Sequence, residues 1–269
     1  MSAVRQPALF LPHGGGPCFF MEWTWGPADT WKNTERFLAA LASTLPAKPK
    51  AIMVVSGHWE EKAFTAGAAS APGLLYDYSG FPEHTYRLTW PAPGDPSLAA
   101  RVSELLREAG LPSGIDTDRG YDHGVFVPLK VAFPDADIPV VPLSMDLSLD
   151  PALHLAAGRV LAPLRDEGVL IIGSGMSFHN LRAYLHPATV ERARAFNDWL
   201  TGAVQLPAAE RGRQLAAWRS APSASFAHPR EEHLIPLMVA AGAGGDPPGR
   251  QVFTDEPMGA AISAFRFDG

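Results

Sequence analysis

The chain has 269 residues, of which 46% are hydrophobic and 19% are charged, and its formal net charge is −6 at pH 7. This length and composition exclude a disordered chain and allow one large domain with a sizeable core. The 22 Lys and Arg residues are scattered and outnumbered by 28 Asp and Glu residues, which argues against a nucleic-acid-binding surface.

The first half of the chain predicts short apolar strands separated by turns and helices. The runs Ala8-Leu-Phe-Leu-Pro12 and Ala51-Ile-Met-Val-Val-Ser56 are typical of buried strands, and Gly110 ends a helical pattern. In chain order we expect a strand at 8–12, a helix at 30–45, strands at 51–56 and 64–69, an ordered aromatic loop at 72–96 and a helix at 97–109.

The second half continues this alternation. We expect a strand at 138–144, a helix at 152–165, a strand at 169–172, helices at 189–204 and 231–241, and a closing strand at 260–267. Fully apolar strands that alternate with helices are typical of a sheet covered on both faces. The sequence therefore predicts an α/β fold in which residues 1–269 form one domain, with a mixed or mostly parallel central sheet and helices on both faces.

Three of the nine histidines directly follow predicted strands. His13 follows the first strand, His58 comes after Ser56-Gly57, and His179 comes after the strand at 169–172. Ligands of open α/β sheets bind outside the carboxyl ends of the strands, where these imidazoles are expected to converge. A single histidine at a strand end is usually a turn residue, but three at equivalent positions indicate a metal site.

Further candidates lie in polar stretches outside the strands. His123 lies in the loop Asp122-His-Gly124, and Glu232 and His233 lie at the predicted start of the helix at 231–241. Glutamates in a first helical turn also serve the helix dipole, so capping is the simpler interpretation of Glu232. Either Glu232 or His233 could nevertheless reach a metal.

Several stretches together resemble one family. They are Leu11-Pro-His-Gly-Gly-Gly-Pro17, Val54-Val-Ser-Gly-His-Trp59, Tyr76-Asp-Tyr-Ser-Gly-Phe-Pro82, Asp122-His-Gly-Val-Phe-Val-Pro-Leu129, Ile171-Ile-Gly-Ser-Gly-Met-Ser-Phe-His-Asn-Leu181 and His228-Pro-Arg-Glu-Glu-His233. In this order the chain resembles the DODA-type (4,5-DOPA dioxygenase-like) extradiol ring-cleavage dioxygenases of class III. The resemblance implies a non-haem, metal-dependent enzyme that opens the ring of a small catecholic compound with O₂.

The resemblance also implies roles for individual residues. His13 and His58 correspond to metal ligands, and the third ligand corresponds to His233, with Glu232 as the alternative. His179 corresponds to the acid/base histidine and also ligates the metal when no substrate is present. His123 is expected to hydrogen-bond substrate or oxygen. The stretch Met176-Ser-Phe178 departs from the family pattern, so the sequence leaves the substrate open.

The expected chemistry involves one divalent metal ion per chain and an aromatic diol. Fe(II) is expected for activity because facial-triad oxygenases use it, and Zn(II) is a possible bound ion because histidine-rich sites accept it. Four aromatic side chains are expected to contact the substrate ring: Tyr78, Phe81, Trp59 and Phe126.

Other interpretations remain open from the sequence. A zinc hydrolase on the same scaffold is one alternative, and a non-catalytic metal-binding protein is the other. The single cysteine, Cys18, excludes an internal disulfide framework and favours a cytoplasmic setting. No apolar run approaches the roughly 20 residues of a membrane span. We therefore expect neither a membrane nor a nucleic acid as partner, and a homo-oligomer is possible.

Overall fold

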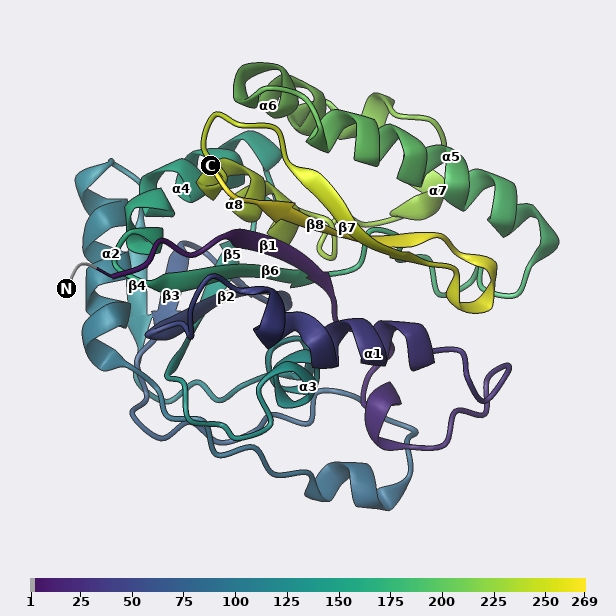
Figure 1. Cartoon of the computed structure of the whole chain (residues 1–269), viewed down its shortest axis with the longest axis horizontal. Helices are drawn as coiled ribbons and strands as arrows, with labels where there is room; N and C mark the ends of the chain where they lie inside the picture. The colour runs from purple at the N-terminus through teal and green to yellow at the C-terminus, as the bar shows by residue number, and fades with distance from the viewer. Residues whose placement is uncertain (1–2) are drawn as a thin grey trace.

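An eight-stranded sheet runs through the centre of the molecule in the order β4-β3-β5-β2-β6-β1-β8-β7 (Figure 1). The computed structural model describes residues 3–269. The strands are β1 Ala8–Pro12, β2 Ala51–Glu61, β3 Phe64–Gly67, β4 Ser113–Asp116, β5 Val140–Asp146, β6 Val169–Gly175, β7 Arg250–Asp255 and β8 Ile262–Phe267. The helices are α1 Lys32–Ala40, α2 Pro96–Glu108, α3 His123–Ala132, α4 Pro151–Leu161, α5 Pro187–Val204, α6 Ala208–Ala216, α7 Ala224–Ala227 and α8 Ile235–Ala243.

The four central strands, β5, β2, β6 and β1, are mutually parallel, whereas β8 and β7 extend the sheet in antiparallel pairing on one side. The register pairs Pro12 of β1 with Gly175 of β6, and Ser56 of β2 with Ser174 of β6. The carboxyl ends of these three strands therefore meet at one edge of the sheet.

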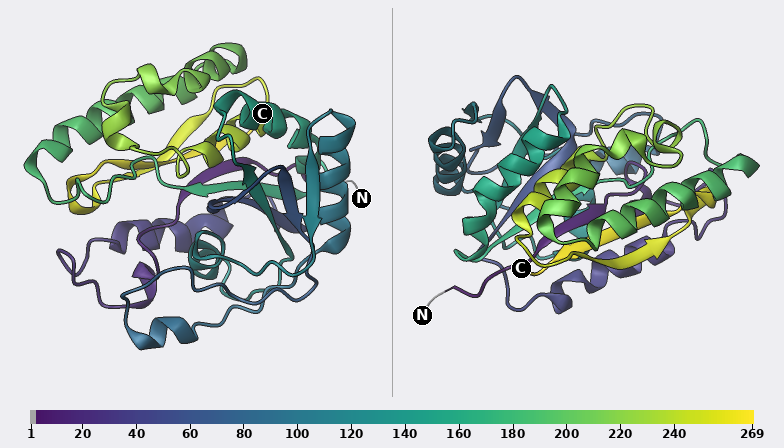
Figure 2. Two further views of the ribbon diagram at one scale, coloured as in Figure 1. Left: turned by 180° about the vertical axis from the view of Figure 1, so that it is seen from behind. Right: turned by 90° about the horizontal axis from the view of Figure 1, so that it is seen from above.

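Helices cover both faces of the sheet (Figures 1 and 2). Helices α2, α4 and α8 pack on one face, with α5 over β7 and β8, and helices α1 and α3 pack on the other. The predicted α/β class with a mixed, mostly parallel sheet is therefore confirmed. No helix in the described part of the chain has the length and apolar character needed to span a bilayer.

Each buried strand divides its side chains between two cores. In β1, Phe10 packs into the core on the α4 and α8 side, and Leu9 and Leu11 pack on the α1 and α3 side. In β6, Ile171 and Ile172 divide in the same way, because successive side chains of a strand point to opposite faces. The uninterrupted apolar character of these strands follows from burial on both faces.

The structure corrects several element boundaries. Strand β2 continues to Glu61 through a shift in register between Val55 and Glu60, so His58 lies within a strand and does not follow one. Helix α8 begins at Ile235, so Glu231 and Glu232 precede the helix and are not in its first turn. The helix expected at 30–45 ends as α1 at Ala40 and continues as a 3₁₀ turn.

The sequence analysis did not predict β4, α3, α6, α7 or β7, and α3 shows the physical reason most clearly. Pro128 lies inside α3 and cannot donate a hydrogen bond to the carbonyl of Gly124, four residues earlier. The hydroxyl of Ser174, on β6, donates to that carbonyl instead. A tertiary contact thus replaces the missing helical bond, which the local sequence does not reveal.

Candidate metal centre

Five histidines converge at the edge of the sheet where β1 and β6 end, beside the last residues of β2, and we call them the histidine cluster: His13, His58, His123, His179 and His233. His13 follows β1 and its backbone N–H donates to the Gly175 carbonyl at 3.1 Å. The ring centroids of His13, His58 and His233 lie 4.8–5.1 Å apart. The predicted convergence of strand-end histidines is therefore present in the structure.

Two glycines allow distant segments to approach the strand ends. A Cβ at Gly175 would lie 2.1 Å from the backbone oxygen of His233, so only glycine lets the segment before α8 come this close. A Cβ at Gly124 would lie 2.5 Å from the hydroxyl of Ser56 and 3.0 Å from the ring of His58. These close approaches place His233 and the start of α3 beside the strand that carries His58.

Two of the three central imidazoles hold Nδ1 within hydrogen-bond distance of an oxygen acceptor, whereas Nδ1 of the third, His58, faces Asp77 Oδ2 at 3.7 Å. His13 Nδ1 lies 2.9 Å from the Gly14 carbonyl oxygen, and His233 Nδ1 lies 2.9 Å from Glu232 Oε1. Carbonyl and carboxylate oxygens only accept, so each Nδ1 carries a proton and donates it. In a neutral ring this leaves the Nε2 lone pair free, which is the arrangement of metal-binding histidines.

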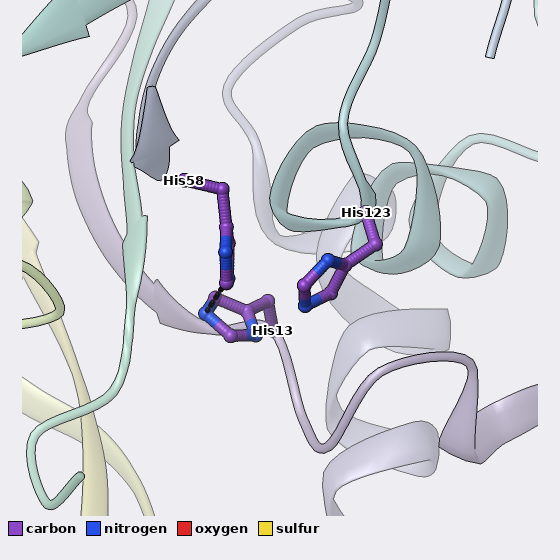
Figure 3. A group of neighbouring side chains, drawn as sticks. All are labelled: His13, His58 and His123. Carbon is purple, nitrogen blue, oxygen red and sulfur yellow. Dashed lines mark hydrogen bonds between the residues drawn. The ribbon is translucent and has the colours of Figure 1, made fainter. Parts of the chain in front are cut away.

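The free Nε2 atoms point toward one another. His58 Nε2 lies 3.3 Å from His13 Nε2 and 3.2 Å from His233 Nε2. The dashed line in Figure 3 marks the contact between His58 and His13. Nitrogens bound to one metal at about 2.0–2.1 Å are separated by about 3.0–3.4 Å in tetrahedral or octahedral geometry. Lone pairs this close repel unless a cation lies between them, so the donor set of His13, His58 and His233 fits a divalent metal ion.

Burial keeps these rings neutral. Desolvation, aided by the neighbouring imidazoles, holds the pKa of His13 and that of His58 well below the ordinary value. Desolvation also lowers the pKa of His233 to about 4, although the hydrogen bond with Glu232 opposes this shift. At neutral pH the three Nε2 lone pairs are therefore available for a metal.

Two carboxylates each hold a pair of cluster histidines. Asp77 Oδ1 accepts from both Nδ1 and the backbone N–H of His123 at 2.9 Å, and Asp77 Oδ2 lies 3.7 Å from His58 Nδ1. Although desolvation raises the pKa of Asp77, the hydrogen bonds from the side chain and backbone of His123, together with the Coulombic interaction with this ring, lower it by more, and the pKa falls below its ordinary value. A charged Asp77 therefore orients His123 and faces His58.

Glu232 plays the same part for the other pair. Its Oε1 lies 2.9 Å from His233 Nδ1 and 3.3 Å from His179 Nδ1, and the two rings stack with centroids 3.4 Å apart. Desolvation raises the pKa of Glu232, but hydrogen bonds from His179 and His233 lower it well below its ordinary value. Glu232 thus lies behind His233, on the side away from the converging Nε2 atoms.

A cavity of about 550 Å³ opens above the histidine cluster. All five cluster histidines line it, and Tyr78 and Phe81 of the aromatic loop form part of its wall. The expectation for Trp59 and Phe126 requires correction, because neither lines this cavity. Trp59 follows His58 in β2 and therefore points to the opposite face, and Phe126 is buried behind Tyr78 with ring centroids 6.5 Å apart.

The sequence analysis missed several residues of the site. Asp77 lies 46 residues before the imidazole that it orients, and its only signal was its place in the stretch Tyr76-Asp-Tyr78. The neighbour of His123, Asp122, instead caps α3 by accepting from the Val125 N–H at 3.2 Å. Three tryptophans from the segment between β1 and α1 also line the cavity: Trp23, Trp25 and Trp31.

Comparisons with known proteins agree with this geometry. Residues 7–266 match the family described as the catalytic LigB subunit of aromatic ring-opening dioxygenase. The chain is 36% identical to dioxygenase tasH of Hapsidospora irregularis, over 98% of this chain and 86% of that one. It is 41% identical to 4,5-DOPA dioxygenase extradiol of Portulaca grandiflora, over 90% and 87% of the two chains. The crystal structure of an uncharacterized protein from Escherichia coli K12 superposes with a TM-score of 0.79 at 32% identity, covering 98% of this chain and all of the other.

Proposed function

Because this chain belongs to the LigB family of aromatic ring-opening dioxygenases, we propose that it cleaves a small catecholic aromatic with O₂ at the bond beside the two hydroxyl-bearing carbons. The chain is by family an extradiol ring-cleavage dioxygenase. In this reaction one ring C–C bond breaks and both oxygen atoms enter the product, which carries one new carboxylate and one new carbonyl group. The convergence of the His13, His58 and His233 Nε2 atoms below the cavity is the observation that carries the proposal.

His13, His58 and His233 would hold the metal, which we propose to be Fe(II). Fe(II) supplies a redox centre at which a diol and O₂ can both bind and exchange electron density. Glu232 is less suited than His233 as third ligand, because its Oε1 faces the Nδ1 atoms of His179 and His233 and its Oε2 faces Arg230 at 3.6 Å, whereas His233 Nε2 lies 3.2 Å from His58 Nε2. His179 lines the same cavity and would serve as a further ligand before substrate enters.

His179 is suited to remove a proton from the diol. Its Nδ1 faces Glu232 at 3.3 Å, so in the neutral ring the Nε2 lone pair is left to accept a hydroxyl proton. The Glu232 carboxylate then stabilises the imidazolium that forms, and the same ring returns the proton after the ring has opened. Such acid–base assistance typically contributes 10²–10⁴-fold to a rate.

His123 is suited to hold an oxygen atom of the substrate or of O₂. Asp77 fixes its Nδ1 at 2.9 Å and thus directs Nε2 away from the carboxylate. That nitrogen accepts from a hydroxyl when neutral and donates to an oxygen anion when protonated. Tyr78 and Phe81 would contact the ring from the cavity wall.

The test is turnover by protein loaded anaerobically with Fe(II). Addition of a catechol and O₂ should consume O₂ and substrate in equal amounts, form a yellow ring-fission product, and place both atoms of labelled O₂ in it. Zinc-loaded protein is the control and should not turn over the catechol. Hydrolysis of esters or amides by the zinc form, with no O₂ uptake by the iron form, would contradict the proposal and favour a zinc hydrolase.

A further inference from the structure

The wall of the cavity is uncharged and largely apolar. Among the described residues that line it, none is Lys, Arg, Asp or Glu. The polar side-chain groups are those of the histidine floor, Tyr78, Ser79 and Tyr184, together with the tryptophan indole N–H groups, of which those of Trp23 and Trp31 are buried without a partner. The remaining wall is built from tryptophans, Phe81, leucines and methionines, among them Met176 and Met258. The wall thus offers contact to apolar groups and no partner for an ionised one.

The mouth of the cavity carries apolar side chains that are exposed to solvent. Trp25 is 53% exposed, Leu181 is 70% exposed and Leu185 is 62% exposed, and all three line the cavity. Exposed large apolar side chains gathered at one place mark a binding surface, because single ones scattered over a surface need no explanation. A bound ligand whose apolar part extends out through this mouth would cover these three side chains.

The charges nearest to the floor are negative. Asp77 and Glu232 contact the cluster histidines directly, at 2.9 Å from His123 Nδ1 and His233 Nδ1. A carboxylate on the substrate would lie against apolar side chains, meet no cation on the wall, and be repelled by the two carboxylates behind the histidine floor. The cavity therefore disfavours an anionic substituent.

The size of the cavity exceeds what a single ring needs. Its volume of about 550 Å³ lies in the range of pockets for drug-sized ligands. A catechol bound with its hydroxyls at the histidine floor leaves space between the ring and the mouth formed by Trp25, Leu181 and Leu185. The substituent on the ring is the part of the substrate that occupies this space.

We propose that the substrate is a catechol with an uncharged, apolar substituent that extends from the ring to the mouth at Trp25, Leu181 and Leu185, and that catechols bearing a carboxylate or a zwitterionic side chain are disfavoured. This inference rests on the proposed function, since it takes the histidine floor as the place of the diol. The inference concerns the substituent on the catechol ring, whereas the proposed function concerns the cleavage of the ring.

Binding without turnover tests the inference separately from activity. Zinc-loaded protein is titrated anaerobically, by isothermal calorimetry, with catechol, 4-propylcatechol and 3-(3,4-dihydroxyphenyl)propanoate. The propyl compound should bind about tenfold more tightly than catechol, because its added methyl and methylene groups leave water. The propanoate should bind about tenfold more weakly than the propyl compound. Equal or tighter binding of the propanoate would overturn the inference.

A variant at the mouth tests where the substituent lies. Leu181→Arg places a cation on a highly exposed position, and Leu181→Gln is the uncharged control. The arginine variant should bind the propanoate about two- to fivefold more tightly than the glutamine variant, the range of an exposed ion pair. An unchanged propanoate affinity would overturn the assignment of the mouth to the substituent.

The iron-loaded protein then separates this inference from the proposed function. A higher kcat/KM for 4-propylcatechol than for the propanoate supports both. Turnover that favours the propanoate leaves the dioxygenase function intact and overturns the substrate inference. If no catechol is cleaved although 4-propylcatechol binds most tightly, the proposed reaction fails while the preference of the cavity stands.

Discussion

Two histidines outside the cluster, His154 and His228, are as buried as His13 and His233 within it, yet their ring nitrogens are used differently. His154 and His228 are both fully buried. His154 donates from Nδ1 to the Asp150 carbonyl at 2.7 Å and accepts the Asp146 N–H at Nε2 at 3.1 Å. His228 donates from Nε2 to the Ser177 carbonyl at 3.0 Å. Neither ring lines the cavity, and both tie backbone segments together.

In the cluster, His13, His123 and His233 instead donate from Nδ1, and the Nε2 atoms of His13 and His233 both lie within 3.3 Å of His58 Nε2. Burial therefore does not distinguish a site from a structural histidine, because desolvation lowers the pKa of both His228 and His233. The distinguishing feature is an unoccupied lone pair that faces other unoccupied lone pairs. Substitutions in the two groups should consequently separate loss of metal, loss of activity and loss of stability.

Removal of a central ligand should have the largest effect. His58→Ala deletes the imidazole whose Nε2 lies 3.2–3.3 Å from both His13 and His233. We expect a loss of metal affinity and activity greater than the about 10–100-fold typical of residues that only orient a ligand. Metal content after dialysis and O₂ uptake check this. The exposed His84 provides the matched control, and His84→Ala should keep its metal; retention of full metal by His58→Ala would contradict the ligand assignment.

Removal of the proposed acid/base should spare the metal. His179→Gln keeps a polar side chain above the His233 ring but removes the imidazole base. We expect kcat to fall by about 10²–10⁴-fold while metal content changes little, because the three Nε2 donors remain. Single-turnover kinetics under O₂, with metal analysis of the same sample, provide the measurement. An unchanged kcat would exclude the base assignment and leave His179 a wall residue.

The two carboxylates should differ in which property they control. Glu232 contacts the proposed ligand His233 at 2.9 Å, whereas Asp77 contacts His123 at 2.9 Å and the ligand His58 only at 3.7 Å. Glu232→Gln should therefore weaken metal binding, by about 10–100-fold, more than Asp77→Asn does. Asp77→Asn should mainly lower kcat at saturating metal.

Metal titrations of the two variants, each followed by assay at saturating Fe(II), check this contrast. Asp118→Asn is the matched control, because this carboxylate is exposed and lies outside the site. Equal metal affinities in Glu232→Gln and Asp77→Asn would contradict the prediction that Glu232 mainly controls metal affinity and Asp77 mainly controls kcat.

Much of the site follows from sequence because topology alone brings it together. Parallel strands end at one edge, so residues after β1 and β6 must lie close to those of β2 whatever the loops do. His13, His58 and His179 could be chosen on this ground. The buried strands could also be predicted, because burial on both faces of the sheet requires nearly every residue to be apolar. The helices could be predicted where one apolar face repeats at helical spacing.

The parts that sequence does not reveal depend on contacts between distant segments. Asp77 meets His123 only because the aromatic loop folds back onto the start of α3. Helix α3 depends on the hydroxyl of Ser174 to satisfy a carbonyl that Pro128 leaves free. The aromatic wall comes from the segment between β1 and α1, whose tryptophans carry no periodic pattern. In each case the determining interaction is tertiary, so local spacing contains no signal for it.

The smallest effect is expected from substitution of His228. It should appear in the pH dependence of the free energy of unfolding. Burial lowers the pKa of His228 to about 3, from an ordinary value near 6.5, so between these values the unfolded chain binds a proton that the folded protein does not. Stability is therefore lost as the pH falls below about 6.5, and the loss from this group amounts to about 2 kcal/mol between pH 7 and pH 5. His228→Gln keeps a donor for the Ser177 carbonyl but cannot titrate.

Urea unfolding of chelator-treated protein at pH 7 and pH 5 measures this contribution. The decrease in the free energy of unfolding between the two pH values should be smaller by about 2 kcal/mol in His228→Gln than in the unsubstituted protein. The cluster histidines and His154 titrate in both proteins, so their contribution cancels in the difference. If the free energy of unfolding of His228→Gln depends on pH as strongly as that of the unsubstituted protein, the acid sensitivity of the fold comes from the histidine cluster. Structural and site histidines would then differ in their response to protons as well as in the use of their ring nitrogens.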